Sequence, residues 1–251
     1  MIKIECCDNL ELMRQIPDST IDLIYCDVLY GTGRKFKDYQ DLKPKRGIIE
    51  EHYLPRIKEM HRILKDTGSI YLQMDYKISH WIRCIFEEIS FILQNEICWQ
   101  YGLGNNNKKH NWQNKHDTIL FGTKTNEYTW NDMRGDVTEQ MKAKYCHSDN
   151  IGKYMMSYDK KYYLKGGKRM SNVWDLANLS ATDKERIKYD TQKPKKLLER
   201  IIKASSNEGD LVADFYGGSF TTAEVCKDLN RNFIGCDINE RACEIGKLRC
   251  T

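Results

Sequence analysis

The sequence predicts an α/β protein with a doubly wound, largely parallel sheet. Strand-like apolar runs alternate with helical segments along most of its 251 residues, and this alternation is typical of parallel strands joined by crossover helices. Two runs, residues 21–27 and 211–214, stop at a carboxylate and enter a glycine-containing loop. Because ligands bind beyond the carboxyl ends of parallel strands, we expect functional groups at these two strand ends. An ordinary strand and turn, with Asp27 only capping the strand, is the alternative for the first run.

The first half of the chain supplies most of the expected elements. We expect strands at residues 2–5, 21–27, 69–74, 91–99 and 118–121, and helices at 10–16, 48–64 and 78–89. Asp8 stands directly before the first helix, where aspartate caps free N–H groups, and Pro17 ends that helix. Thr67 and Gly68 are expected to form the C-cap of the second helix.

From about residue 126 the character of the sequence changes. Residues 126–185 are polar, rich in Lys, Tyr, Asn and Met, and lack clear periodicity, so we expect a separate insert. Sheet signals resume with a helix from Pro194, a strand at 211–214, a helix at 223–229 and a strand at 232–236 that ends at Asp237. The predicted regions are therefore 1–125, 126–185 and 186–251.

Composition restricts the class of protein. The hydrophobic fraction is 40% and the mean hydropathy is −0.69. No apolar run approaches the roughly 18 residues of a membrane span, and the amino terminus enters a strand directly, so we expect neither membrane segment nor signal peptide. The ten cysteines form no CxxC pair, which indicates a reduced, cytoplasmic protein. Cys146 and His147 lack a second ligand pair, so we expect no metal.

Basic residues are concentrated in three segments. They are Arg34, Lys35, Lys37, Lys43, Lys45 and Arg46; Lys108, Lys109 and Lys115; and Lys160, Lys161, Lys165, Lys168 and Arg169. The net charge of +4 is mild, and charge runs are often only solvated surface. Two of the segments are flanked by aromatic residues, however, and this combination favours a nucleic-acid partner.

The carboxyl-terminal strand, glycine loop, helix and strand predict a nucleoside site. Asp237 follows Asp214 by 23 positions, the spacing at which an acid can bind ribose hydroxyls. Gly217 and Gly218 allow the backbone to approach a ligand. The loop is not GxGxxG, and acids at both strand ends favour S-adenosylmethionine, which carries an ammonium, a sulfonium and a ribose. A βαβ unit without a ligand is the alternative.

Four sequence blocks resemble those of the β-class DNA amino-methyltransferases, which methylate adenine N6 or cytosine N4 and include type II restriction-modification enzymes. Residues 27–30 (DVLY) stand in the place of the family's D-P-P-Y, and residues 114–121 resemble its KHDTILF segment. Residues 191–194 (TQKP) match a third segment, and 214–222 (DFYGGSFTT) resemble D-P-F-x-G-S-G-T-T. The catalytic block precedes the cofactor block, which is the permuted order of this class.

The resemblance implies a Rossmann-like S-adenosylmethionine-dependent methyltransferase sheet in permuted motif order. It implies that a base flipped out of duplex DNA stacks on Tyr30, while Asp27 and the carbonyl of Val28, followed by Leu29, bind its amino group. Thr191 and Lys193 would lie near the cofactor carboxylate, and Asp8 near its adenine, unless Asp8 is only a helix cap. The expected cofactor-binding residues are Asp8, Thr191, Lys193, Pro194, Asp214, Tyr216, Gly217, Gly218, Ser219, Thr221, Asp237, Ile238 and Asn239.

The chain departs from the family at four positions. Val28, Leu29 and Phe215 replace prolines, and Phe220 replaces a glycine. The Val28 carbonyl can serve as well as that of proline, but rigidity worth ~0.4–1 kcal/mol per proline is lost. If residue 220 needs a positive φ, phenylalanine is strained there. A catalytically silent DNA-binding protein with a retained S-adenosylmethionine fold is therefore one alternative.

The resemblance also implies the substrate and partners. Asp27 at the first catalytic position favours adenine N6, with cytosine N4 as the alternative. Double-stranded DNA, a cognate restriction endonuclease and a homodimer are the expected partners, with residues 126–185 as the target-recognition region. The expected DNA-binding residues are Arg34, Lys35, Lys37, Lys108, Lys109, Trp112, Lys165, Lys168 and Arg169. His116 and Asp117 are expected to orient the sheet.

Amide-methyltransferases place the cofactor block first, and nicotinamide oxidoreductases need GxGxxG, so both are weaker alternatives.

Overall fold

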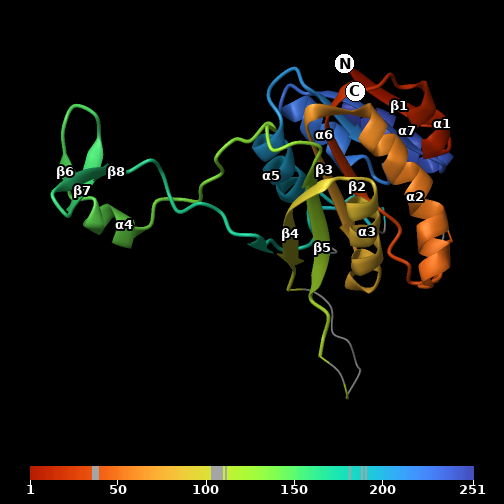
Figure 1. Cartoon of the computed structure of the whole chain (residues 1–251), viewed down its shortest axis with the longest axis horizontal. Helices are drawn as coiled ribbons and strands as arrows, with labels where there is room; N and C mark the ends of the chain where they lie inside the picture. Colours follow the sequence, from red (N-terminus) through yellow and green to blue (C-terminus); the bar gives the residue numbers. More distant parts are fainter. Residues whose placement is uncertain (36–39, 103–109, 111, 181, 188, 190) are drawn as a thin grey trace. The chain divides into compact units, whose positions relative to one another are not determined.

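The computed structural model describes residues 1–251 except 36–39, 103–109, 111, 181, 188 and 190. The chain forms two compact units, one of Met1–Asn131 with Asn172–Thr251 and one of Asp132–Ser171 (Figure 1). The smaller unit contains fewer residues than the predicted insert, 126–185, because residues at both ends of that range pack into the larger unit. Trp130 stacks on Phe121 at 5.8 Å between ring centroids, and Trp174 is buried.

The larger unit is built on one eight-stranded sheet. Its strands, in spatial order, are β1 (Ile2–Cys6), β11 (Asn232–Asp237), β10 (Leu211–Asp214), β2 (Ile21–Asp27), β3 (Leu64–Met74), β5 (His116–Thr123), β4 (Ile92–Gln100) and β9 (Val173–Asp175). Only the two pairs that involve β5 are antiparallel. The predicted doubly wound, largely parallel α/β sheet is thus confirmed.

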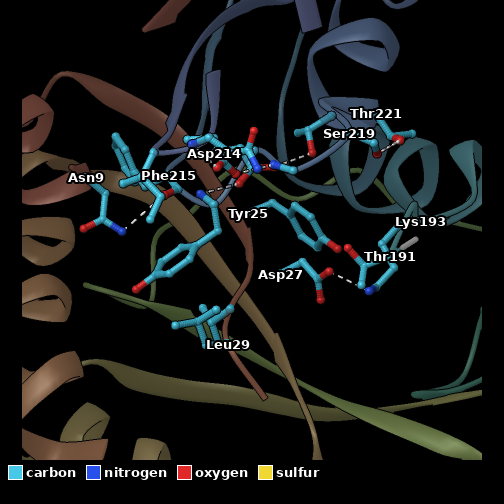
Figure 2. A pocket seen from close by; sticks show the side chains of 18 of the residues that line it. Asn9, Tyr25, Asp27, Leu29, Thr191, Lys193, Asp214, Phe215, Ser219 and Thr221 are labelled. Carbon is cyan, nitrogen blue, oxygen red and sulfur yellow. Dashed lines mark hydrogen bonds and ion pairs between the residues drawn. The ribbon is translucent and has the colours of Figure 1, made fainter. Parts of the chain in front are cut away.

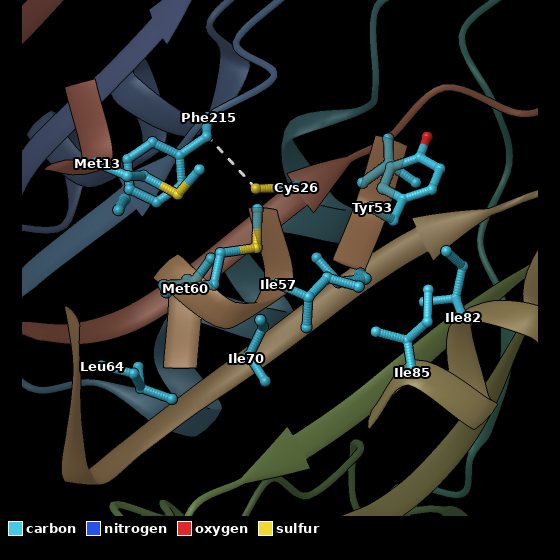
Figure 3. Close-up of a cluster of buried hydrophobic side chains, with 14 of the residues drawn as sticks. Met13, Cys26, Tyr53, Ile57, Met60, Leu64, Ile70, Ile82, Ile85 and Phe215 are labelled. Carbon is cyan, nitrogen blue, oxygen red and sulfur yellow. Dashed lines mark hydrogen bonds between the residues drawn. The ribbon is translucent and has the colours of Figure 1, made fainter. Parts of the chain in front are cut away.

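Helices cover both faces of this sheet. On one face lie α1 (Asn9–Gln15), α2 (Arg46–Ile63) and α3 (Tyr76–Glu88), whose apolar residues share a core with Ile24 and Cys26 of β2 (Figure 3). On the other face lie α5 (Lys195–Ser205), α6 (Thr221–Asp228) and α7 (Glu240–Cys250), which share a second core with Leu23 and Tyr25. Successive side chains of a strand point to opposite faces, so β2, whose residues 23–26 are apolar and buried on both faces, is the expected central strand. Among the described residues we find no helix with the length and hydropathy of a membrane span.

The direction of winding reverses between β10 and β2. These strands are parallel neighbours, with Ala213 beside Ile24, and their connections lead to opposite edges of the sheet. The carboxylates that end them, Asp27 and Asp214, therefore lie side by side at the switch point, and Asp237 follows at the end of β11. Open α/β sheets bind ligands at such a point.

One boundary prediction was wrong, and one helix was not predicted. The second helix, α2, ends at Ile63, and the predicted C-cap at Thr67 and Gly68 lies inside β3. Here glycine serves close packing, because a Cβ at Gly68 would stand 2.7 Å from the side chain of Leu64. The final helix, α7, was not predicted, and its N-cap is Asn239, whose side chain accepts hydrogen bonds from Arg241 N and Ala242 N.

The smaller unit contains a helix and a three-stranded antiparallel sheet. These elements are α4 (Glu139–Lys144), β6 (His147–Ser148), β7 (Lys153–Ser157) and β8 (Lys160–Tyr163). The turn between β7 and β8 consists of Tyr158 and Asp159, both at positive φ, and the Tyr158 side chain is 95% exposed. Short strands of alternating lysine, tyrosine and methionine carry little periodic signal, so the sequence did not predict them.

Phe220 occupies the strained position that the sequence analysis anticipated. It is the N-cap of α6 with φ 53°, and its side chain is fully buried. Its ring fills the space that a Cβ of Gly217 would need and lies 2.5 Å from where a Cβ of Gly246 would stand. A side chain at position 217 would therefore displace the Phe220 ring, whereas the expected approach of the Gly217 backbone to a ligand stays a prediction.

We predict that Phe220→Gly destabilises the protein although it relieves this strain. A non-glycine residue at positive φ costs about 1–2 kcal/mol, whereas deletion of a buried phenylalanine ring costs about 3–5 kcal/mol. The expected net loss is about 1–4 kcal/mol in the free energy of unfolding, measured by urea denaturation. Phe220→Leu keeps part of the packing and all of the strain. Its free energy of unfolding should therefore lie between those of the wild type and Phe220→Gly. Greater stability of Phe220→Gly than of the wild type would contradict the assigned packing.

Candidate active site

A cavity of about 240 Å³ lies at the switch point of the sheet (Figure 2). Sixteen of the seventeen predicted catalytic and cofactor-binding residues line it: Asp8, Asp27, Val28, Leu29, Tyr30, Thr191, Lys193, Asp214, Tyr216, Gly217, Gly218, Ser219, Thr221, Asp237, Ile238 and Asn239. Pro194 is outside this lining and is the N-cap of α5. Blocks separated by more than 160 positions in the sequence therefore meet in one cavity.

Asp27 lies between a cation and a hydroxyl. Its Oδ2 is 2.5 Å from Lys193 Nζ, and its Oδ1 accepts a hydrogen bond from the Tyr30 hydroxyl at 2.9 Å. The side chains of Asp27 and Lys193 are only 19% and 13% exposed. Burial raises the pKa of Asp27 above its ordinary value, and the neighbouring Lys193 ammonium opposes that shift.

Hydrogen bonds hold the loop that lacks the two family prolines. The Val28 N–H donates to the carbonyl of Gln73 at 3.0 Å, a bond that proline could not make. The Leu29 carbonyl accepts a hydrogen bond from the Tyr53 hydroxyl on α2 at 2.8 Å. A buried hydrogen bond contributes about 1 kcal/mol net, comparable with the rigidity of one proline. The substitution of Val28 and Leu29 for prolines is thus offset within the fold.

Asp117 anchors the other end of Tyr30. The buried Asp117 carboxylate accepts from the Tyr30 hydroxyl at 2.5 Å, from Gln73 Nε2 at 2.8 Å and from the Tyr101 hydroxyl at 2.9 Å. Tyr30 and Tyr101 come from two different loops at this edge of the sheet. Asp117 was predicted to orient the sheet; the structure shows that it also fixes the tyrosine of the DVLY block. No spacing rule in the sequence links these two residues.

The cofactor block forms the other end of the cavity. Asp214 is 2% exposed and accepts from the Tyr216 N–H at 3.0 Å and from the Thr222 hydroxyl at 2.6 Å. Asp237 Oδ2 accepts from the Gly218 N–H at 2.8 Å, where Gly218 has φ +50°. Burial raises the pKa of Asp214 to about 7 despite these hydrogen bonds. A cation placed beside Asp214 would stabilise its ionised form.

Helix α2 supplies residues that the sequence analysis missed. Arg56 donates to Asp8 Oδ2 at 3.0 Å and to Asn9 Oδ1 at 2.7 Å, while Asp8 also caps α1 through Leu10 N. The helix-cap role expected for Asp8 is therefore present, Asp8 also lines the cavity, and its place near the cofactor adenine stays a prediction. His52, one turn before Arg56, bonds to the Tyr216 hydroxyl, and burial lowers its pKa to about 4, so it is neutral at pH 7. The i, i+4 spacing of His52 and Arg56, which places both on one face of the predicted helix, was the sequence signal that could have identified them.

None of the six predicted DNA-binding residues that the structure describes belongs to the lining of this cavity. Arg34, Lys35, Lys165, Lys168 and Arg169 are exposed, and the Trp112 side chain is 92% exposed. Lys37, Lys108 and Lys109 lie outside the described residues. Within the described part of the chain, no three His, Cys, Asp or Glu side chains form a group that could hold a metal ion.

Comparisons with known proteins identify the family. The sequence model of the DNA methylase family matches residues 21–248. The type II methyltransferase M.HpaI of Haemophilus parainfluenzae is 33% identical over 248 residues, covering 97% of this chain and 72% of the relative. The DNA adenine methyltransferase YhdJ of Escherichia coli (strain K12) is 31% identical over 243 residues, covering 96% and 80%.

Solved structures share the fold. The M1.HpyAVI–SAM complex has a TM-score of 0.63 at 21% identity, over 99% of this chain and all of that one. The cytosine-N4-specific PvuII DNA methyltransferase has a TM-score of 0.72 at 18% identity, over 100% and 86%. The architecture is thus that of S-adenosylmethionine-dependent methyltransferases.

The chain belongs to the DNA methylase family. It is an S-adenosylmethionine-dependent DNA methyltransferase that acts on an exocyclic amino group, N6 of adenine or N4 of cytosine. The cavity fits this cofactor, whose ammonium and sulfonium are cationic, because five carboxylates (Asp8, Asp27, Asp41, Asp214 and Asp237) and only two cations (Arg56 and Lys193) line it. Membership of this family argues against the two weaker alternatives from the sequence analysis, an amide-methyltransferase and a nicotinamide oxidoreductase.

We predict that Tyr53→Phe slows methyl transfer by about tenfold, because release of the Leu29 carbonyl loosens the DVLY loop and misplaces Asp27. The buried carbonyl that loses its partner should also cost about 1–3 kcal/mol of stability. Rate and unfolding free energy are measured on the same preparation. Tyr71→Phe is the matched control, since it removes a buried hydroxyl that bonds to Ser205 at 2.7 Å, away from the loop. Equal rates for the two variants would contradict the assigned role of Tyr53.

Proposed function

We propose that this protein methylates N6 of adenine at a specific site in duplex DNA. The observation that carries the proposal is the position of the Lys193 ammonium. A cationic nitrogen lies 2.5 Å from Asp27 Oδ2 and over the Tyr30 ring, 5.2 Å from its centroid. The site can therefore bind a nitrogen that carries positive charge, which is what the amino group of the base becomes during methylation.

Each residue has a distinct role in this proposal. The flipped base stacks on Tyr30, while Asp27 and the Val28 carbonyl accept the two N–H bonds of its amino group. S-adenosylmethionine supplies the methyl group, carried on a sulfonium. As the amino nitrogen gains positive charge, the carboxylate of Asp27 stabilises it, in surroundings that exclude much of the water. Asp117 holds the Tyr30 ring at the angle that stacking requires, and most of the rate enhancement comes from positioning.

The cofactor residues divide between the two ends of the cavity. In this proposal Asp214 and the loop of residues 215–219 hold the ammonium end, and Asp237 binds the ribose hydroxyls. Asp8, fixed by Arg56, lies at the adenine end, with Ile238 and Asn239 beside it. Thr191, Ser219 and Thr221 supply hydroxyls to the remaining polar groups of the cofactor.

The smaller unit is proposed to read the DNA sequence. Between residues 132 and 171 the chain carries nine Lys and Arg against five Asp and Glu. That excess equals the net charge of +4 of the whole chain, so the larger unit is neutral overall. Basic charge provides sequence-independent attraction to phosphates, and the exposed Tyr158 at the hairpin turn can contact bases.

Adenine is favoured over cytosine by two considerations. Asp27 stands at the first position of the catalytic block, and the relative YhdJ, with 31% identity, is described as an adenine methyltransferase.

A restriction endonuclease with the same recognition sequence is proposed as the cognate partner, because M.HpaI is described as a type II methyltransferase. The protein is proposed to act in the cytoplasm of a prokaryote, because the relative M.HpaI is a bacterial protein. The expected homodimer stays a prediction, which sedimentation would check.

Nucleoside analysis tests the proposed reaction. Purified protein is incubated with tritiated S-adenosylmethionine and unmethylated mixed-sequence DNA, which is then digested to nucleosides. We expect label in N6-methyladenosine, and at least about a hundredfold less with Asp27→Ala, which removes the charge-stabilising group. Label in N4-methylcytosine would overturn the choice of base, and wild-type activity of Asp27→Ala would overturn the assigned site.

We predict that S-adenosylmethionine binds more tightly as the pH rises from 5.5 to 7. Without ligand, Asp214 stays protonated up to its raised pKa of about 7, whereas a cationic ligand favours the ionised form. Binding therefore releases a proton below pH 7, and affinity increases by up to about tenfold per pH unit. By the same linkage, the unliganded protein loses stability as the pH rises from about 4 to 7.

Isothermal titration calorimetry in two buffers of different ionisation enthalpy measures both the affinity and the released proton. Asp214→Asn is the matched variant, because it keeps the shape of the side chain and cannot ionise. Its affinity should be weaker and independent of pH in this range. An affinity of the wild type that stays constant or falls between pH 5.5 and 7 would contradict the assignment of Asp214 to the cationic part of the cofactor.

A further inference from the structure

We propose that Lys193 is a placeholder: its ammonium occupies the position of the target amino group in the substrate-free enzyme, and the flipped base must displace it. This inference rests on the proposed function. It assigns Lys193 a role at the base end of the cavity, whereas the resemblance implied contact with the cofactor carboxylate. Figure 2 shows the Lys193 side chain directed at Asp27, with the ion pair drawn between them.

The ammonium covers both groups that would recognise the base. It lies 2.5 Å from Asp27 Oδ2, the carboxylate oxygen that is not bonded to Tyr30. It also lies over the face of the Tyr30 ring, 5.2 Å from the centroid. A base that stacks on this face lies about 3.5 Å from it, as carbon atoms in contact do. The ring and the ammonium cannot occupy that space together, so Lys193 has to move when the base enters.

The same geometry explains why an ammonium is suited to this place. A partly buried carboxylate needs a compensating donor, and lysine supplies a positive charge and three N–H groups on a flexible stem. The exocyclic amino group supplies one N–H to the same carboxylate and a second to the Val28 carbonyl. Because lysine carries its ammonium on a flexible four-carbon stem, a rotation of this side chain can separate it from Asp27 without a change in the sheet.

Displacement makes Lys193 a specificity determinant. A base with an exocyclic amino group gives Asp27 a new N–H donor in exchange for the ammonium. A base that presents a carbonyl oxygen there, as thymine does, would set two acceptors against each other, so the ion pair stays closed. Selection against the wrong base then comes from the cost of opening the ion pair without a replacement donor, in addition to the attraction for the right base.

Base flipping without cofactor tests the placeholder. The probes are duplexes of defined sequence, first screened for labelling by the wild type, that carry 2-aminopurine next to the candidate target base, whose departure from the stack raises the fluorescence. Lys193→Met removes the ammonium, and we expect about five- to tenfold more flipped base at equilibrium than in the wild type. Lys193→Gln, which is also neutral, should give an increase in the same direction if the methionine variant folds poorly.

Two controls separate the placeholder from general charge effects. Lys193→Arg keeps the cation and should flip no more than the wild type. Lys196→Met removes one positive charge from an exposed position on α5 and should also match the wild type. If the wild type labels DNA but the fluorescence is unchanged in Lys193→Met and Lys193→Gln, the placeholder role of Lys193 is wrong and the proposed function stands. No label and no fluorescence rise in any variant would overturn the proposed function and the placeholder with it.

Discussion

A largely buried carboxylate at the end of the central strand sets the requirements for the rest of the site. Asp27 loses hydration in its position beyond β2, so it needs a cation and hydrogen-bond donors nearby. Lys193 and Tyr30 supply them, and Asp117 in turn fixes Tyr30. The chain obtains these groups from three separate parts of the sequence, and only the folded sheet brings them together.

The order of blocks along the chain follows from the winding of the sheet. The reversal between β10 and β2 places the catalytic and the cofactor carboxylates on adjacent parallel strands. Asp27 can therefore face the reacting nitrogen while Asp214 faces the cofactor, within one cavity. The excess of carboxylates suits a reaction in which positive charge stays in the cavity throughout, first on the cofactor and then on the methylated nitrogen.

Much of this arrangement was predictable from the sequence, for a physical reason. A strand such as 21–27, apolar on both faces and ended by an acid, has one stable place in an α/β protein, the centre of a parallel sheet. Side-chain contacts across the fold were not predictable. The hydrogen bonds from Val28 to Gln73 and from Tyr53 to Leu29 explain how a loop without its family prolines stays fixed, and neither has a sequence signal. The fit of the Phe220 ring against Gly217 and Gly246 likewise depends on packing between distant elements.

The central claim is that Asp27 and the Val28 carbonyl bind the exocyclic amino group of a flipped base. A crystal structure of the complex with the unreactive analogue sinefungin and a duplex containing the target site tests it most directly. The account predicts the amino nitrogen about 3 Å from both Asp27 and the Val28 carbonyl, within ordinary hydrogen-bond distance, with the base flat on Tyr30. A flipped base whose amino group lies elsewhere, with the ion pair between Asp27 and Lys193 still closed, would contradict the account.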